Sequence, residues 1–299
     1  MNQYAATIGF FDGVHLGHRY LANQLCGQAA RLGMKSMLIT FDRHPRQVLH
    51  ADYVPRLLST LDEKIGMLRQ TGVDEVRVLH FTPELAGMDA RQFMRDVLVG
   101  QLGVRVLLMG YDHHFGHGGG TLEEYYAWGR EAGIEVVLAC ELPGAKVSSS
   151  AVRRMLLSGD VAGASRLLGR PYDLRGEVVS GHRVGHRLGF PTANIVLPVG
   201  KLVPATGVYA VDVLLPDGLQ RGGMLCIGRR PTVDNGDDLS VEVNIFDFGG
   251  DLYGQSITLY LVARLRDEQT FPSLDALREQ LQRDEQAARQ ILSQYHEQR

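Results

Sequence analysis

The 299-residue sequence predicts an α/β domain with a parallel sheet, followed by a small antiparallel β-barrel with a C-terminal helix. In the first half, short apolar runs alternate with stretches of helical periodicity. In the second half, strand-like runs follow one another with turn residues between them and no helix. A chain of this length can bury two cores, and we place the domains at residues 1–167 and 168–299.

The first half begins with a buried strand at residues 5–11, after which apolar residues recur at roughly helical spacing. Thr60 with Glu63, and Thr121 with Glu124, form capping-box patterns that begin two later helices. Alternating strands and helices imply a parallel sheet covered on both faces, with ligands at the carboxyl ends of the strands. Four further buried strands are predicted, at residues 36–41, 76–81, 104–110 and 134–139.

The second half carries the strands of the barrel. A turn at 215–218 separates two of them, and an amphipathic helix beginning at Ser273 has apolar positions suited to covering one barrel face. The barrel strands are predicted at residues 175–180, 207–215, 223–228, 239–248 and 255–266.

The composition indicates a soluble globular protein, and we expect a cytoplasmic location. The hydrophobic fraction is 44%, the charged fraction is 22% and the net charge is −3. These values argue against a surface that coats nucleic acid, and no apolar run reaches the roughly 18 residues of a membrane span. We expect small-molecule partners and a monomer or weak homo-oligomer. Cys26, Cys140 and Cys226 are far apart and odd in number, so we expect buried, reduced thiols.

Residues 7–18 form the most informative segment, in which an apolar strand breaks at glycines before a helix. A strand-to-helix junction gathers unpaired amides and the positive end of the helix dipole, and so attracts phosphate. Gly13 and Gly17 would let a triphosphate approach the backbone. His15 and His18 are three residues apart, so they share a helix face and can donate to phosphate oxygens, although a metal site has similar spacing.

Three other segments follow strands and could complete this site. The glycine- and histidine-rich loop 110–120 is a flexible flap over a nucleotide or, less favoured, a metal site. Residues 148–154 begin a helix, and their hydroxyls can cap it while their amides and Arg153 bind phosphate. Residues 42–46 either line the site or form an ordinary proline-terminated loop.

The strand, the Phe-Asp-Gly turn and His15-Leu16-Gly17-His18 together resemble the HxGH signature of the nucleotidylyltransferase superfamily, and its longer form resembles bacterial FAD synthetases. The resemblance implies that residues 42–46 line the flavin nucleotide end. It also implies Asp112 as a polar contact to substrate or metal, where many members have Asn. The implied ATP and phosphate contacts are Gly9, Phe10, Asp12, Gly13, Gly17, Asp112, Ser148, Ser149 and Arg153.

The second half has its own motif at residues 181–194, where glycines and basic side chains can wrap phosphates. Thr192 and Asn194 offer hard oxygen ligands suited to the Mg²⁺ that ATP carries, although the same segment could simply begin a strand. Glu242 lies in an alternating strand, with Asn244 and Phe246 on its face. By itself, such a glutamate is an ordinary solvated strand position or a general base.

Together with residues 207–210 and 241–244, this motif resembles riboflavin kinases. The resemblance implies that Glu242 is the base that takes the proton from the ribityl 5′-hydroxyl as it attacks the γ-phosphate of ATP. The implied flavin and ATP contacts are Gly181, Gly185, Arg187, Gly189, Pro191, Thr192 and Asn194.

The two halves together resemble the bacterial bifunctional riboflavin kinase/FMN adenylyltransferase family. This implies riboflavin and FMN as substrates, ATP with Mg²⁺, and His15 and His18 as catalytic residues that stabilise the transition state of adenylyl transfer. The alternative is a flavin-binding regulator or carrier with the same fold and little or no turnover.

Overall fold

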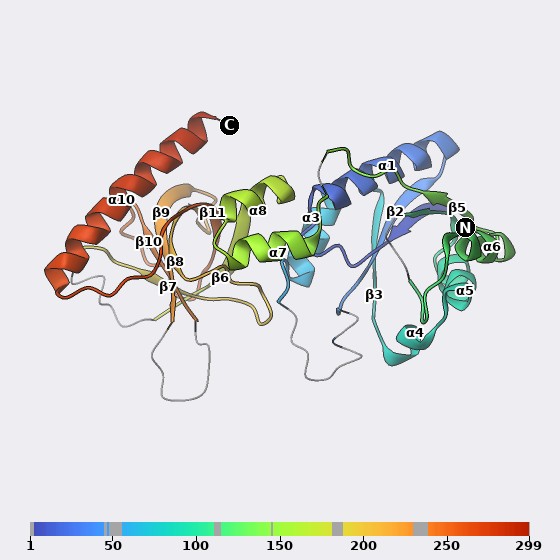
Figure 1. The fold of residues 1–299 in the computed structure, drawn as a ribbon, viewed down its shortest axis with the longest axis horizontal. Coiled ribbons are helices and arrows are strands. Elements are labelled where there is room, and N and C mark those ends of the chain that lie inside the picture. Colours follow the sequence, from blue (N-terminus) through green and yellow to red (C-terminus); the bar gives the residue numbers. More distant parts are fainter. Residues whose placement is uncertain are drawn as a thin grey trace. The chain divides into compact units, whose positions relative to one another are not determined.

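The computed structural model describes residues 3–44, 47, 56–110, 115–144, 146–180, 188–229 and 239–298. The chain forms two compact units, Met1–Ser149 and Ser150–Arg299. Figure 1 shows a sheet with flanking helices in the first unit and a barrel in the second. The boundary between these two units lies between Ser149 and Ser150, at the beginning of the two helices that precede the barrel. The boundary between residues 167 and 168 was predicted from function and stays a prediction.

The first unit contains a five-stranded sheet in the order β3-β2-β1-β4-β5, and all four pairings are parallel. The predicted parallel sheet is therefore confirmed. The chain moves outward from β1 to β3 and then crosses to β4 on the other side of β1, so the switch point lies at the carboxyl ends of β1 and β4. The strands are β1 (Tyr4–Ile8), β2 (Lys35–Phe41), β3 (Glu75–Leu79), β4 (Val104–Met109) and β5 (Glu135–Leu138).

Helices cover both faces of this sheet. One hydrophobic core lies under α1 and α3, and a second lies under the π-helix η1 and α6. The capping boxes at Thr60 and Thr121 are both formed, as predicted. The helices are α1 (Leu16–Leu32), α3 (Leu61–Arg69), α4 (Pro83–Gly87), α5 (Ala90–Gln92), η1 (Phe93–Gln101) and α6 (Leu122–Ala132).

The second unit is a closed antiparallel barrel, as predicted, with strands in the order β10-β7-β6-β11-β8-β9. The sequence predicted five of its strands. For the sixth strand, β7, it left open only that a strand begins in the Pro-Thr-Ala-Asn segment, and β7 does begin there, at Ala193. The strands are β6 (Tyr172–Val179), β7 (Ala193–Val196), β8 (Gly207–Leu214), β9 (Gln220–Arg229), β10 (Leu239–Ile245) and β11 (Ser256–Arg266).

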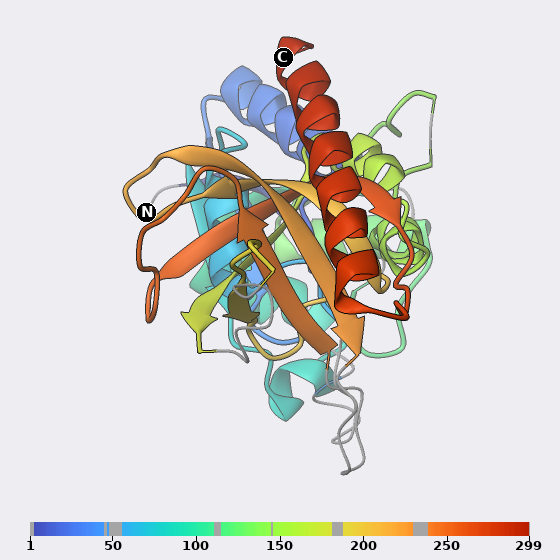
Figure 2. The same ribbon diagram turned by 90° about the vertical axis from the view of Figure 1, so that its left-hand side faces the viewer.

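Helices α7 (Ser149–Leu157) and α8 (Val161–Leu168) precede the barrel, and α10 (Leu274–Glu297) follows it. Ser273 caps α10, as its sequence position predicted. Figure 2 shows α10 running across the outside of the barrel strands. Its apolar side packs in a cluster with residues of β8, β9 and β11 and with Phe246, which follows β10. Among the described residues, no helix is both long and apolar enough to span a membrane.

The three cysteines are free thiols, but the expectation that they are buried is wrong. Cys26 is half-buried, whereas Cys140 and Cys226 are exposed. Cys140 lies in the loop after β5. Cys226 alternates with Leu225 and Ile227, which are fully buried, so its side chain lies on the outer face of β9.

Candidate functional site

The turn after β1 sets the geometry of the first site. Phe11, Gly13 and Val14 have left-handed φ values of 55°, 77° and 42°. The Phe11 ring folds back over Gly9, where a Cβ atom would lie 2.9 Å from a ring carbon. Two non-glycine residues in this conformation store backbone strain, which is commonly found at functional turns. The turn brings His15 to the N-cap position, immediately before α1.

The Asp12 carboxylate clamps this turn to the segment before α3. Asp12 is only 3% exposed. Its Oδ2 accepts from the Leu58 amide at 3.0 Å, and its Oδ1 accepts from the Ser59 amide at 3.1 Å. The Ser59 hydroxyl in turn accepts from the Gly13 amide at 3.1 Å. The Asp12 carboxylate thus binds backbone amides that hold the turn in place, and its role as a phosphate contact stays a prediction.

The two histidines lie at the beginning of α1 as a stacked pair. His15 is the N-cap residue, and its Nδ1 accepts from the His18 amide at 3.3 Å. The rings are 3.6 Å apart between centroids and inclined by 17°. An Nδ1 acceptor implies that neutral His15 carries its proton on Nε2, which makes Nε2 a donor. Gly17 permits this stacking, because a Cβ atom there would lie 3.2 Å from the His15 ring.

Five predicted residues line one pocket of about 560 Å³ at the carboxyl edge of the sheet: His15, Gly17, His18, Ser148 and Ser149. The pocket contains Gly110 after β4 and the segment after β5, and so lies at the switch point of the sheet.

The segment after β5 also lines this pocket, and sequence reasoning missed the part of it that precedes Ser148. Gln24 on α1 holds it, donating to the Cys140 carbonyl at 3.0 Å and accepting from its amide at 2.8 Å. The Ser149 hydroxyl donates to the Asp12 carbonyl at 2.9 Å, so the end of this segment is tied to the turn. The only sequence feature that could have indicated a role for this segment is its place directly after a predicted buried strand. The exposed side chain of Lys146 adds positive charge to the lining.

A second group of residues lies at the carboxyl ends of β1, β2 and β3. Asp42 contacts His80 and accepts from the Phe81 amide at 2.9 Å. Burial alone would raise the pKa of Asp42, but these hydrogen bonds and the charge of His80 lower it below its usual value. The rings of Phe10 and His44 meet edge to face, with centroids 4.8 Å apart.

Some predicted site residues are not placed by the structure. Asp112, Gly181, Gly185 and Arg187 lie outside the described residues, as do residues 45 and 46. Arg153 is half-buried on α7, in the second unit, and its role in binding phosphate stays a prediction.

In the barrel, the predicted kinase residues meet across neighbouring strands. Glu242 on β10 lies opposite Asn194 on β7 and opposite Cys226 on β9. The Thr192 hydroxyl donates to Glu242 Oε2 at 3.3 Å. Val241 and Val243 are buried on the opposite face, so the predicted alternation of β10 is confirmed. Three oxygen-bearing side chains from two separate segments thus gather on the outer face of the barrel.

The loop before β7 is fixed to the same strand. Asn244 is 8% exposed, and its side-chain amide donates to the Pro191 carbonyl at 2.7 Å. Gly189 has a φ of 84°, a left-handed conformation that favours glycine. These two features set the direction in which Thr192 approaches Glu242.

The neighbouring Cys226 was not predicted as part of this site. Desolvation by surrounding atoms, followed by the negative charges of Glu242 and Glu268, raises the pKa of the thiol to about 11. Cys226 therefore stays neutral beside Glu242 at physiological pH. The position of Cys226 opposite Glu242 follows only from the pairing register of β9 and β10.

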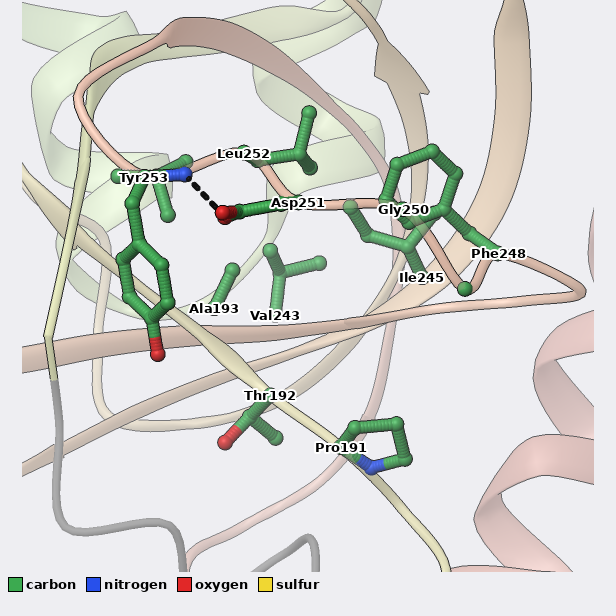
Figure 3. Close-up of a pocket in the computed structure, with 12 residues that line it drawn as sticks. Pro191, Thr192, Ala193, Val243, Ile245, Phe248, Gly250, Asp251, Leu252 and Tyr253 are labelled. Atoms are coloured by element: carbon green, nitrogen blue, oxygen red, sulfur yellow. Dashed lines mark hydrogen bonds between the residues drawn. The ribbon is translucent and has the colours of Figure 1, made fainter.

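A pocket of about 340 Å³ adjoins Thr192 on the other side of the strand. Figure 3 shows Ala193 and Val243 below the loop that carries Asp251, Leu252 and Tyr253. The Asp251 carboxylate accepts from the Tyr253 amide at 2.9 Å and thereby stabilises this loop. Sequence reasoning missed the pocket because the residues of the loop at 248–253 are typical of an ordinary turn. The walls are mostly apolar: Val178, Pro191, Thr192, Ala193, Val243, Ile245, Phe248, Gly249, Gly250, Asp251, Leu252 and Tyr253.

Comparison with known proteins covers both halves of the chain. The FAD synthetase family model matches residues 1–151, and the riboflavin kinase family model matches residues 168–292. A bifunctional riboflavin kinase/FMN adenylyltransferase of Escherichia coli K12 is 39% identical over 289 residues, covering 95% of this chain and 91% of that protein. A Bacillus subtilis protein of the same name is 36% identical over 287 residues, covering 94% of this chain and 90% of that protein.

A solved structure described as a macrolide-efflux protein from Streptococcus pneumoniae has a TM-score of 0.86 and 32% identity, and covers 97% of this chain and 95% of that chain. Two family models, one for each half, and relatives that align along almost the whole length therefore agree with the two sets of motifs. The chain belongs to the bifunctional riboflavin kinase/FMN adenylyltransferase family.

Proposed function

We propose that this chain makes FAD from riboflavin in two steps, each of which consumes ATP. The barrel converts riboflavin and ATP to FMN and ADP, and the α/β unit converts FMN and a second ATP to FAD and pyrophosphate. The observation that carries the proposal is that two motif sets, far apart in sequence, form two separate sites, with a pocket in each unit.

In adenylyl transfer, an oxygen of the FMN phosphate attacks the α-phosphorus of ATP. A bond forms between that oxygen and phosphorus, and the bond to the bridging oxygen breaks as pyrophosphate leaves. His15, His18 and the first amides of α1 donate to the charge that develops on the oxygens of the α-phosphoryl group. The stacking of the two rings orients both donors before substrate binds. Ser148, Ser149 and Arg153 bind the rest of the triphosphate.

In the kinase step, Glu242 accepts the proton of the riboflavin 5′-hydroxyl while that oxygen attacks the γ-phosphorus. The new bond forms between the ribityl oxygen and phosphorus, and ADP leaves with the bridging oxygen. Thr192 orients the Glu242 carboxylate through its hydrogen bond of 3.3 Å. No covalent enzyme intermediate is needed, because positioning and charge neutralisation carry phosphoryl transfer.

Thr192 and Asn194 are the residues that would hold the Mg²⁺ of ATP. The donor set fits a hard cation, because the Thr192 hydroxyl, the Asn194 side chain and the Glu242 carboxylate approach one another on neighbouring strands. When bound, Mg²⁺ neutralises negative charge on the phosphates.

The two substrates of the kinase step lie on opposite sides of β7 and β10. The hydroxyl to be phosphorylated must reach Glu242, which lies on the outer face, so riboflavin binds on that face. Ala193 and Val243 face the apolar pocket of about 340 Å³ instead, and this pocket takes the adenine of ATP. Thr192 both lines this pocket and contacts Glu242, so we place the phosphates of ATP beside Thr192.

Small molecules are the proposed partners: ATP, riboflavin, FMN and FAD. We also propose a cytoplasmic location, a monomer or weak homo-oligomer, no binding of nucleic acid, and a functional boundary between residues 167 and 168.

Incubation of the full chain with riboflavin, ATP and Mg²⁺, followed by chromatography of the flavins over time, tests this function. FMN is expected to appear first and FAD later, and added FMN is expected to give FAD directly. A regulator or carrier would bind riboflavin and return it unchanged. An enzyme with a single activity would stop at FMN, or would use only added FMN.

A further inference from the structure

Lys64 is a buried lysine at the catalytic edge of the parallel sheet. It lies on α3, one turn after the Thr60 cap, and only 2% of its surface is exposed. The helix repeat places Lys64 between Leu61 and Leu68, on the side of α3 that faces the core. Lysines are almost never fully buried unless they are paired with other groups. The buried ammonium group of Lys64 therefore needs groups that pair with it.

The ammonium group of Lys64 makes two short contacts, each to a different strand end. Nζ donates to the carbonyl of Phe41, the last residue of β2, at 2.8 Å. It also lies 4.0 Å from the centre of the Phe10 ring, within cation–π range. Phe10 also meets the ring of His44 edge to face. The Phe10 ring thus contacts both a cation and an imidazole.

The charge of Lys64 is balanced by two carboxylates. Burial lowers the pKa of Lys64 from 10.5 to about 8, and the negative charges of Asp12 and Asp42 oppose this shift. Asp12 belongs to the turn after β1, and Asp42 immediately follows β2. A lysine that is costly to keep charged is commonly retained at a functional site.

These contacts lie beside the nucleotide pocket. That pocket contains His15, His18 and the segments after β4 and β5, whereas Lys64 contacts the ends of β1 and β2. If the triphosphate occupies the pocket, an in-line attack on its α-phosphorus places the acceptor on the side away from the leaving pyrophosphate. The partly exposed Phe10 and the residues after β2 lie next to the turn that carries His15, outside the lining of the pocket itself.

We propose that Lys64 is a positioning residue for the acceptor FMN in adenylyl transfer, because it fixes Phe10 and the carboxyl end of β2 at the acceptor side of the site. The inference rests on the proposed function. Lys64 itself is too buried to be assigned a contact with substrate. Its effect passes through Phe10 and through the main chain after Phe41.

The test compares the full-length wild type with Lys64→Met, which keeps the length of the side chain but removes its charge, and with Lys64→Arg, which keeps the charge. Lys35→Met is the matched control, because Lys35 is exposed at the opposite end of β2. For each protein, KM and kcat are measured with FMN and with ATP varied in turn. FMN binding without ATP is measured by fluorescence quenching, and riboflavin phosphorylation reports on the barrel.

We expect Lys64→Met to raise KM and the dissociation constant for FMN by about tenfold, because a charge-assisted hydrogen bond and a cation–π contact are lost. KM for ATP and the rate of riboflavin phosphorylation should change less than about twofold. Lys64→Arg should recover part of the FMN affinity, and Lys35→Met should match the wild type. The thermal midpoint should change little, because Asp12 and Asp42 keep their other hydrogen-bond donors.

Unchanged FMN constants in Lys64→Met would overturn the proposal. Equal losses for FMN and ATP, with a lowered thermal midpoint that Lys64→Arg does not restore, would also overturn it and leave a purely structural lysine. If Lys64→Met does not fold, Lys64→Gln takes its place with the same expectations. Failure of the proposed function is a different result, namely a wild-type chain that makes no FAD from FMN and ATP.

Discussion

The two sites of this chain are built in different ways. In the α/β unit, one continuous segment leads from β1 through a strained turn to the stacked pair His15 and His18. In the barrel, Glu242 meets Asn194 and Cys226 only because three strands pair in a particular register. The first site is therefore encoded locally, whereas the second depends on contacts between residues far apart in sequence.

This difference has a consequence for the effects of substitution. The first site depends on backbone conformation and on buried clamps such as Asp12, so small steric changes should disturb it. The second site depends on side chains presented by a rigid barrel, so removal of a functional group should affect its chemistry without affecting the fold. Because each site has its own activity, the activity of the unaltered site is an internal control for substitutions of Glu242 and His18.

The largest effect is expected from Glu242→Gln. Glutamine can still accept from Thr192 but cannot take the proton of the riboflavin hydroxyl, so kcat of the kinase step should fall roughly 100- to 10,000-fold. FAD formation from added FMN should continue at the wild-type rate. Chromatography of the flavin products measures both. Glu177→Gln, on the exposed face of β6, is the control, and equal loss of both activities would contradict the separation of the two sites.

Next in size is His18→Ala. Removal of a donor from the site of phosphoryl charge should lower kcat of FAD formation about 100- to 1,000-fold, while riboflavin phosphorylation is unchanged. Initial rates with saturating FMN and ATP give the first value. A rise in KM for ATP with kcat unchanged would mean that His18 binds the ground state and the transition state equally well.

A smaller effect is expected from Gly17→Ala. The new methyl group would lie 3.2 Å from the His15 ring and displace it by a few tenths of an ångström, which should lower kcat/KM for FAD formation about tenfold. Gly27→Ala on the same helix is the matched control, because a Cβ atom there meets nothing within 4 Å. It should keep full activity and stabilise α1 by about 1 kcal/mol, measured by urea unfolding. Equal activity in both variants would show that the His15 ring tolerates displacement.

The smallest effect is a pH dependence of FAD formation. Lys64, on which the negative charges of Asp12 and Asp42 act, has a pKa lowered by burial to about 8. His80 contacts Asp42, and His44 contacts the Phe10 ring that Lys64 also contacts. Lys64 loses its proton as pH rises through that value, so kcat/KM for FMN should decline there in the wild type and hold to higher pH in Lys64→Arg. Stability should move the opposite way, because the unfolded chain binds more protons than the native chain above pH 8. Parallel pH profiles in the two proteins would exclude Lys64 as the cause.

Much of the first site could be predicted because its residues are close in sequence. A strand followed by glycines and a helix has few possible conformations. The positions of His15, His18 and Gly17 at the strand-to-helix junction could therefore be predicted from local rules. The partners of Asp12 could not be predicted in this way, since Leu58 and Ser59 come from another segment. The burial of Lys64 and its contacts with Phe10 and Phe41 were not predicted, because lysines are usually exposed and these partners come from other segments.

The barrel site was less accessible to sequence reasoning. The alternation of β10 placed Glu242 on one face, but the short strand β7 and the register that brings Asn194 opposite Glu242 emerged only in the folded barrel. The expectation of a buried thiol failed at Cys226 for the same reason. Whether Cys226 faces the core or the outer surface depends on the pleat of β9, and a shift of one residue would reverse it.

By itself, the sequence determined the order of two domains, the parallel sheet, the barrel with its covering helix, and the motifs that carry phosphate chemistry. These features follow from apolar periodicity, capping residues and turn residues, all of which act over a few neighbouring positions. Only the tertiary structure decided the stacking of His15 on His18, the placement of Lys64 beneath Phe10, and the meeting of Thr192 with Glu242. These depend on packing and strand register between distant segments, which local sequence rules do not specify.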